Sequence, residues 1–215
     1  TETGSAHSHV VDNPGSDGTD TLRNVETLRF ADQDFDITPS GQNLQGTSSG
    51  DSLTGAAGDD GLFGYAGNDT LQGLGGDDEI QGGGGDDTIE GGDGDDTLYG
   101  GDGDDTITGG DGVDVIYGGE GADILKDVGD STIYGEGGND TISPTDTESG
   151  RANGLKVYGG DGDDNISGPT FLIVDAGDGD DTVTLSSGQP GQTPTLIAGG
   201  AGSVSYTHLT LPTRC

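Results

Sequence analysis

Residues 82–126 read GGGGDDTIE GGDGDDTLY GGDGDDTIT GGDGVDVIY GGEGADILK, five consecutive blocks of nine residues. Each block follows Gly-Gly-x-Gly-x-Asp-x-(Leu/Ile)-x, so an aspartate and an aliphatic residue each return every nine positions. A fixed period of this kind is the signature of a repeat architecture, in which each unit stacks on its neighbours. The nine positions are numbered here from one to nine, with the aspartate at position six and the aliphatic residue at position eight.

The nonapeptide predicts a turn followed by a short strand. Its glycines accept the positive φ of tight bends, and its last three residues favour a strand whose middle side chain faces opposite to its neighbours. Two nonapeptides then form one coil of about eighteen residues, and successive coils stack in parallel about 4.8 Å apart. We therefore expect an all-β fold, a parallel β-roll, with Ile89, Ile107 and Leu125 on one inner wall and Leu98 and Ile116 on the other.

Stacking also brings the loop aspartates together, and such a column of carboxylates would repel itself unless cations lay between the loops. Carboxylates and backbone carbonyls form a hard oxygen site that suits Ca²⁺. Nine uninterrupted repeats over residues 46–126, with each ion between loops two repeats apart, predict several calcium ions, about seven in this regular array. The candidate ligands are the position-six residues Asp60, Asp69, Asp78, Asp87, Asp96, Asp105, Asp114, Asp123, Asp140, Asp164 and Asp181, the position-three residues Asp93, Asp102, Asp111, Asp161 and Asp178, and the loop glycines Gly83, Gly85, Gly92, Gly94, Gly101, Gly103, Gly110, Gly112, Gly119, Gly121, Gly160 and Gly162.

This repeat resembles the repeats-in-toxin (RTX) family, also known as the hemolysin-type calcium-binding repeats, over roughly residues 46–200. The resemblance implies a parallel β-roll with calcium ions between neighbouring loops on each side. It also implies a bacterial protein that a type I secretion system exports unfolded from a calcium-poor cytosol and that folds outside the cell.

The composition excludes a conventional apolar core. Of the 215 residues, 47 are glycine and only 27% are hydrophobic, and the net charge of −35 comes from 41 acidic and six basic residues. Such a charge excludes nucleic acid as a partner, because phosphate recognition needs lysine and arginine, and it argues against anionic membranes. Without calcium the chain is expected to be disordered. Cys215 is the only cysteine, so calcium would replace disulfides as the staple of an extracellular module.

The chain divides by composition into four predicted segments. Residues 1–40 form an N-terminal flanking segment, expected to cap the roll with two short strands; a short helix over Leu22–Leu28 is the alternative. Residues 41–126 are the regular roll. Residues 127–203 are degenerate repeats with insertion loops, in which alternate loops lack the aspartate, so one side is expected to bind less calcium. Residues 204–215 resemble translated sequencing-adapter read-through and are expected to be an artefact.

No catalytic constellation is found. Gly46–Gly50 matches G-x-S-x-G, but that motif needs a preceding hydrophobic strand and a following helix, and here it falls in the repeat register. The zinc-protease motif H-E-x-x-H is absent, and no segment fits the twelve-residue EF-hand loop. His7 and His9 have no third metal ligand nearby. The longest notable apolar run, Phe171–Val174, is too short to span a membrane.

The sequence therefore predicts a non-enzymatic, calcium-binding module of a larger secreted bacterial protein, located outside the cell or at its surface. Its expected partners are calcium ions, the rest of the parent polypeptide and the type I secretion machinery. Two alternatives stay open: a structural spacer or cap of an adhesin or surface-layer protein, and an accessory module of a polysaccharide-active enzyme. Tyr99, Tyr117 and Tyr134 are too few and too irregularly spaced to indicate a glycan-binding aromatic ladder.

Overall fold

The computed structural model describes residues 28–29, 34–35, 41–145, 154–169, 173–186 and 196–208. The chain divides into two compact units, Thr1–Pro39 and Ser40–Cys215. In the first unit, β1 (Leu28–Arg29) pairs antiparallel with β2 (Asp34–Phe35). Two short strands are thus present where they were predicted, while residues 22–27 of the alternative helix lie outside the described residues.

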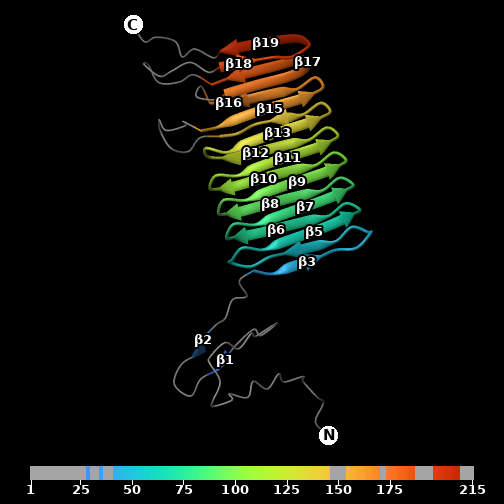
Figure 1. The fold of residues 1–215 in the computed structure, drawn as a ribbon, viewed down its shortest axis with the longest axis vertical. Coiled ribbons are helices and arrows are strands. Elements are labelled where there is room, and N and C mark those ends of the chain that lie inside the picture. Colours follow the sequence, from blue (N-terminus) through green and yellow to red (C-terminus); the bar gives the residue numbers. More distant parts are fainter. Residues whose placement is uncertain are drawn as a thin grey trace. The chain divides into compact units, whose positions relative to one another are not determined.

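The second unit is a stack of coils whose strands form two walls, joined by loops (Figure 1). The first wall contains β3 (Asn43–Gln45), β5 (Gly61–Ala66), β7 (Glu79–Gly84), β9 (Thr97–Asp102), β11 (Val115–Glu120), β13 (Thr132–Gly137), β15 (Lys156–Asp161) and β18 (Leu196–Ala198). The second wall contains β4 (Ser52–Thr54), β6 (Thr70–Gly75), β8 (Thr88–Asp93), β10 (Thr106–Asp111), β12 (Ile124–Val128), β14 (Thr141–Ile142), β16 (Asn165–Gly168) and β19 (Gly202–His208). The long strand β17 (Ile173–Leu185) contributes to both walls.

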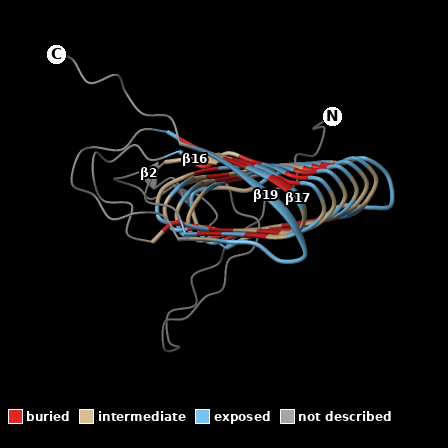
Figure 2. Ribbon diagram, turned by 90° about the horizontal axis from the view of Figure 1, so that it is seen from above, coloured by how far each residue is buried: buried red, intermediate tan, exposed pale blue. Residues whose placement is uncertain are grey.

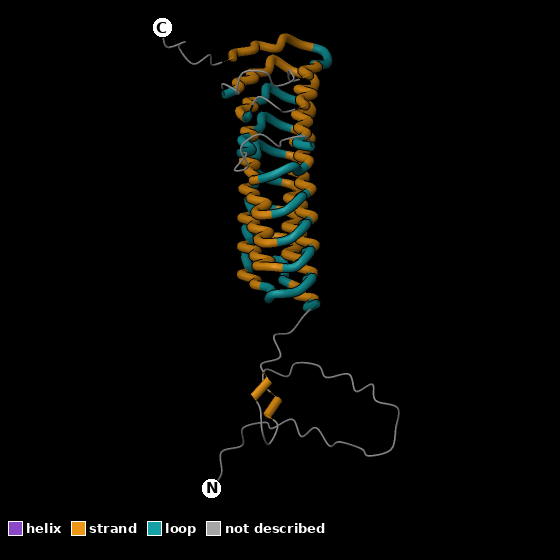
Figure 3. Tube along the Cα trace, turned by 90° about the vertical axis from the view of Figure 1, so that its left-hand side faces the viewer, coloured by secondary structure: helices purple, strands orange, loops and turns teal. Residues whose placement is uncertain are grey.

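Strands of one wall pair in parallel, and the described residues contain no helix (Figure 3). The predicted all-β parallel β-roll is confirmed. In the regular array each residue pairs with the residue eighteen positions later, as Thr88 does with Thr106 and Leu98 with Ile116. One coil is therefore two nonapeptides.

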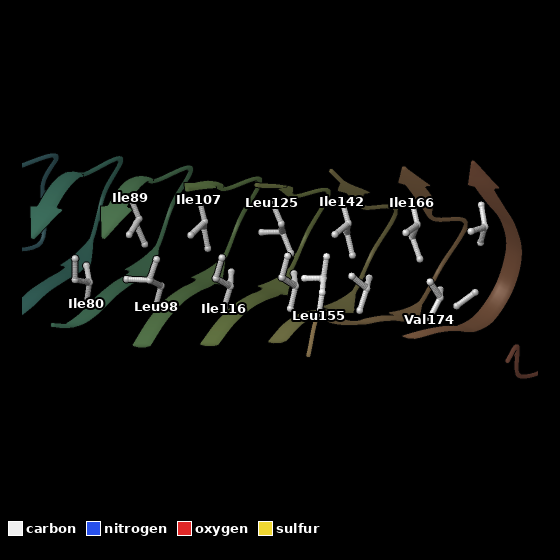
Figure 4. Close-up of a cluster of buried hydrophobic side chains, with 14 of the residues drawn as sticks. Ile80, Ile89, Leu98, Ile107, Ile116, Leu125, Ile142, Leu155, Ile166 and Val174 are labelled. Atoms are coloured by element: carbon white, nitrogen blue, oxygen red, sulfur yellow. The ribbon is translucent and has the colours of Figure 1, made fainter. Parts of the chain in front are cut away.

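The core is a double row of position-eight side chains between the walls. Ile89, Ile107 and Leu125 lie in one row, opposite Leu98 and Ile116, as the period predicts (Figure 4). All five are at most 1% exposed. Viewed along the stack, buried residues follow the two long sides of a flattened coil, and the turns are intermediate or exposed except at their position-six residues (Figure 2). Each coil adds only two large side chains to the core. Contacts between the loops of neighbouring coils must therefore contribute much of the stability of the stack.

The irregular repeats keep the same stack. The short repeat 127–134 pairs seventeen residues apart, Val115 with Thr132, and its missing residue appears as a register shift between Thr108 and Asp111 of β10. The segment between β14 and β15 raises the next spacing to 24, from Asp140 to Asp164. Deletion and insertion are thus both absorbed without breaking the walls.

A row of stacked tyrosines follows position nine of the first wall. The ring centroids of Tyr99 and Tyr117, of Tyr117 and Tyr134, and of Tyr134 and Tyr158 lie 4.9, 4.9 and 4.8 Å apart, with interplanar angles of 4°, 5° and 9°. The uneven spacing of these tyrosines in the sequence comes from the short repeat and the inserted segment, and in the structure the rings nevertheless lie in register.

The C-terminal strand β19 continues into the segment assigned from sequence to an artefactual tail. Gly202 to His208 pair with Gly179 to Leu185 of β17. Residues 202–207 of this strand are exposed. No helix able to cross a membrane occurs among the described residues.

Candidate metal sites between the loops

The position-six residues form two columns, one at each edge of the flattened coil. The loops that precede the second wall contribute what we name the long column: Asp51, Asp69, Asp87, Asp105, Asp123, Asp140, Asp164 and Asp181. The loops that precede the first wall contribute the short column: Asp60, Asp78, Asp96 and Asp114, followed by Ser131 and Leu155. Every acid from Asp60 to Asp181 in these columns is at most 4% exposed.

Within a column, each carboxylate binds the backbone of the neighbouring coil. The amide of Asp87 donates to Oδ1 of Asp105 at 2.7 Å, and the amide of Asp105 donates to Oδ1 of Asp123 at 2.8 Å. These charge-assisted hydrogen bonds fix each side chain between two coils. The short column ends when the amide of Asp114 donates to the hydroxyl of Ser131 at 2.7 Å.

The second oxygen of these carboxylates is buried without a hydrogen-bond partner. This holds for Oδ2 of Asp69, Asp78, Asp87, Asp96, Asp105, Asp114, Asp123, Asp140, Asp164 and Asp181. Among the described residues no lysine, arginine or histidine forms an ion pair with them. A buried charge without a partner costs several kcal/mol, so each of these oxygens needs either a cation or a proton.

A small space beside these oxygens is lined by glycine, except at Asp181, whose repeat has Ala176 at position one. A Cβ added at Gly82 would collide with Oδ2 of Asp87 and would lie 2.8 Å from the carbonyl oxygen of Gly100 in the next coil. The same pair of contacts surrounds Gly64, Gly73, Gly91, Gly100 and Gly118. Position one therefore keeps open a space where a carboxylate oxygen and a backbone carbonyl oxygen converge, which is the donor set of a hard cation.

The predicted glycines at positions two and four have a conformational and packing role. Gly101 and Gly103 have φ of 125° and 126°, and a Cβ at either would collide with the carbonyl oxygen of the corresponding residue one coil earlier, Gly83 or Gly85. All twelve glycines predicted as ligands have positive φ. Three non-glycine residues, Tyr65, Leu74 and Glu136, adopt the same left-handed conformation at position two, at 77°, 83° and 74°.

The first two loops differ from the rest. The amide of Ala56 donates to Oδ2 of Asp60 at 2.6 Å, and the amide of Thr47 donates to Oδ2 of Asp51 at 2.6 Å. Asp60 also accepts the amide of Gln42 at its other oxygen, so both of its oxygens have donors. The predicted ligand Asp60 therefore lacks the unpartnered oxygen that its successors present.

The position-three acids are not brought into the loop interior. Asp93, Asp102, Asp111, Asp161 and Asp178 are all exposed. Their carbonyl oxygens accept the amides of position-four glycines one coil earlier; the carbonyl of Asp102, for example, accepts from Gly85 at 2.7 Å. The structure thus separates the buried position-six acids from the position-three acids, although the sequence pattern placed both among the ligands.

Desolvation by burial raises the pKa of the position-six carboxyls. The pKa of Asp105 rises to about 7 and that of Asp164 to about 7, and those of Asp96 and Asp123 rise to about 6, each partly offset by a backbone hydrogen bond. Burial and contact with Asp127 raise the pKa of Asp114 to about 8. The metal-free loops therefore hold protons more tightly than an unfolded chain does.

Sequence reasoning missed two groups. Position-five side chains form a second ladder, in which the amide of Asp95 donates to Asp77 at 2.9 Å and the amide of Asp104 donates to Asp86 at 3.1 Å. The recurring Asp-Asp and Asn-Asp pairs were the available signal. The other is Asp127, a buried acid at position one, where the pattern has glycine.

No cluster of three or more His, Cys, Asp or Glu side chains placed to hold a metal ion occurs in the part of the chain that the structure describes. The loops explain this, because an inter-loop space receives one carboxylate, or two beside Gly109, and the other oxygens that line it come from the backbone. The residues present fit a calcium ion: the carboxylate oxygen is buried and unpartnered, the space is kept open by glycine, and a carbonyl oxygen faces into it.

Comparison with protein families matches the RTX calcium-binding nonapeptide repeat at residues 40–71, 63–98, 90–125, 127–144, 156–168 and 173–189, more than half of the chain. The chain belongs to this family. It is accordingly a calcium-binding β-roll module. Of the three breaks between matched segments, one precedes the short repeat at Asp127, one coincides with the insertion after β14, and one lies between β16 and β17. Comparisons with curated proteins and with solved structures return no match.

Proposed function

We propose that this RTX module folds only when calcium binds between its loops, and that it does so outside the cell as part of a larger secreted bacterial protein. The observation that carries the proposal is the series of buried Oδ2 atoms without donors in both columns. Ionised, they oppose folding by electrostatic repulsion and desolvation. A cation that binds the folded form alone stabilises it by mass action.

The secretion step is supported by the family and by the physical cost of folding. A chain that remains unfolded where calcium is scarce could be exported unfolded by a type I system and would then fold in a calcium-rich medium. The proposed partners are calcium ions, the parent polypeptide and the secretion machinery. We propose no catalytic role for the module itself, and its place is the cell exterior or the cell surface.

The test is a calcium titration of the full chain, followed by far-ultraviolet circular dichroism. We expect little β signal after calcium is stripped, and a cooperative rise with a midpoint of about 10⁻⁴–10⁻³ M, typical of extracellular modules. Magnesium should not substitute, because it demands octahedral geometry and sheds its water reluctantly. Full β signal in the stripped protein, or equal folding with either ion, would contradict the proposal.

Of the two alternatives, a spacer role gains support from the continuous stack, whose four tyrosine rings extend the packing outside the core. A glycan-binding role does not, because the rings cover one another's faces, and those faces are what a sugar would stack on. A spacer would also need calcium to be folded and stiff. The calcium titration therefore tests the calcium-dependent folding that the secreted module and the spacer have in common.

A further inference from the structure

The short repeat at residues 127–134 brings two buried carboxylates together where the other loops have one. In the preceding coil of the short column, a Cβ at Gly91 would meet Oδ2 of Asp96 and the backbone carbonyl oxygen of Gly109. One coil later, a Cβ at Gly109 would collide with Oδ2 of Asp114 and with the side-chain oxygen Oδ1 of Asp127. A carboxylate therefore replaces a carbonyl oxygen in this space.

Strand alternation explains the replacement, because Asp127 lies two residues after the core residue Leu125 and faces the same, inner side. Between Thr108 and Asp111 of β10 the pairing with β12 slips, because repeat 127–134 is one residue short. Asp127 stands at position one of this repeat, the last residues of β12 surround it, and its side chain enters the space that glycine leaves open elsewhere.

Both carboxylates are fully enclosed, and three of their four oxygens lack a donor. Asp114 is 0% exposed and Asp127 is 1% exposed. Oδ2 of Asp114 and both side-chain oxygens of Asp127 have no hydrogen-bond partner. Two of these oxygens, Oδ2 of Asp114 and Oδ1 of Asp127, converge beside Gly109, and no other group donates a proton to them. Two ionised carboxylates maintain such an arrangement only around a positive charge.

We propose that Asp114 and Asp127 together bind one calcium ion in a two-carboxylate site, distinct from the one-carboxylate spaces that repeat along both columns. This inference rests on the proposed calcium-dependent folding and extends it to a repeat that the consensus pattern marks as defective. Two carboxylates neutralise a divalent ion, and affinity for calcium rises with the number of charged ligands. The site should therefore be the tightest in the chain, about tenfold tighter than its neighbours.

Calcium binding isotherms by equilibrium dialysis test the proposal on the full chain. The wild type should show a tight class of about one ion per chain, followed by a weaker class of many ions. Asp127→Asn keeps the shape of the side chain and removes its charge, and Asp127→Gly restores the consensus residue of position one. Both variants should lose the tight class. Asp130→Asn, an exposed acid of the same short repeat, should retain it.

A second readout separates an ion from a shared proton. If calcium occupies the pair, Asp127→Asn weakens calcium binding and at the same time raises the residual β signal of the stripped protein at pH 8, because one repelling charge is gone. If the two acids share a proton at neutral pH, the isotherm of Asp127→Asn stays that of the wild type, and the proposal is overturned. A tight class that persists in both Asp127 variants, or a wild type without one, also overturns it and leaves calcium-dependent folding intact. A wild type that binds no calcium overturns both.

Discussion

The long column keeps an aspartate at position six from Asp51 to Asp181, whereas the short column gives up its acid after Asp114 and continues with Ser131 and Leu155. Leu155 is 1% exposed and occupies the position that an aspartate fills in earlier coils. The strands on its wall nevertheless keep their pairing, Ile133 with Val157 and Val157 with Val174. Strand stacking therefore tolerates either an acid or an apolar side chain at position six.

This difference separates two ways of closing the edge of a coil. In the long column a buried carboxylate creates the need for a cation, and the cation in turn holds two loops together. At Leu155 the edge is closed by apolar burial, which needs no ion. Replacing buried charged groups by well-packed apolar ones is frequently neutral or stabilising. The calcium requirement that we propose thus arises from the acids in the loops and not from the β-roll as such.

The largest expected effect concerns protons as substitutes for calcium. The folded-state pKa values of Asp96, Asp105, Asp114, Asp123 and Asp164 lie at about 6 to 8, above the ordinary carboxyl value of 3.8. A raised folded-state pKa adds stability that is complete below the unfolded pKa and is lost as the pH rises through the folded pKa. Calcium-stripped protein should therefore gain β signal between pH 8 and pH 5.

Circular dichroism of calcium-stripped protein across this pH range is the measurement. Low pH should have the opposite effect on calcium binding, because protons compete with calcium for the same oxygens. The calcium concentration at the folding midpoint should therefore rise as the pH falls. Stripped protein with the same or a weaker β signal at pH 5 would show that the buried carboxyls do not govern folding.

The next effect compares the two ways of closing a coil edge directly. Leu155→Ala should cost about 2–5 kcal/mol through a cavity, by the same amount at any calcium concentration that keeps the protein folded. Asp164→Asn, in the long column, should show a cost that increases with calcium concentration, because the wild type gains stability from each occupied site and the variant lacks one.

Urea denaturation at two calcium concentrations, both above the folding midpoint, separates these behaviours. A cost for Leu155→Ala that increases with calcium as steeply as that of Asp164→Asn would mean that the edge at Leu155 also depends on an ion, and the distinction between the columns would fail.

A smaller effect separates buried from exposed acids of neighbouring repeats. Asp105→Asn removes a buried charge whose Oδ1 accepts the amide of Asp87, a charge-assisted bond of about 1.5–3 kcal/mol. Asp111→Asn makes the same chemical change at an exposed position-three acid six residues away. The calcium midpoint should rise several-fold for Asp105→Asn and stay unchanged for Asp111→Asn.

Circular dichroism titrations of both variants provide the comparison. Equal shifts would mean that the 41 acidic residues act as a diffuse charge cloud, and the ordered inter-loop sites would have to be abandoned.

The nonapeptide period was enough to predict the β-roll, its core rows and the buried acids of position six, because each follows from local geometry repeated at a fixed interval. The period could not show that Asp60 is satisfied by the amides of Ala56 and Gln42, since these contacts are made only in the first coils. Nor did it single out Asp127, because the consensus has glycine at position one and so gives no side chain to that inward-facing place in the strand. The role of a consensus residue can be predicted from the pattern, whereas the roles of Asp60 and Asp127 depend on contacts between coils.

The smallest expected effect concerns the exposed ladder of position five, which runs along both columns. Asp95 accepts the amide of Val113 at 2.9 Å, and Asp104 accepts the amide of Ala122 at 2.8 Å, but neither Val113 nor Ala122 has a side-chain acceptor to pass on. Val113 and Ala122 therefore interrupt the ladder, one in each column, and the coils that follow them still stack. Asp95→Ala should therefore cost only about 0.5–1.5 kcal/mol, the net contribution of one hydrogen bond, in urea denaturation at saturating calcium. Asp102→Ala, an exposed position-three acid of β9, is the matched control and should cost less. A cost for Asp95→Ala as large as that of Asp105→Asn would place position five among the acids that hold calcium, and the assignment of the sites to position six alone would be wrong.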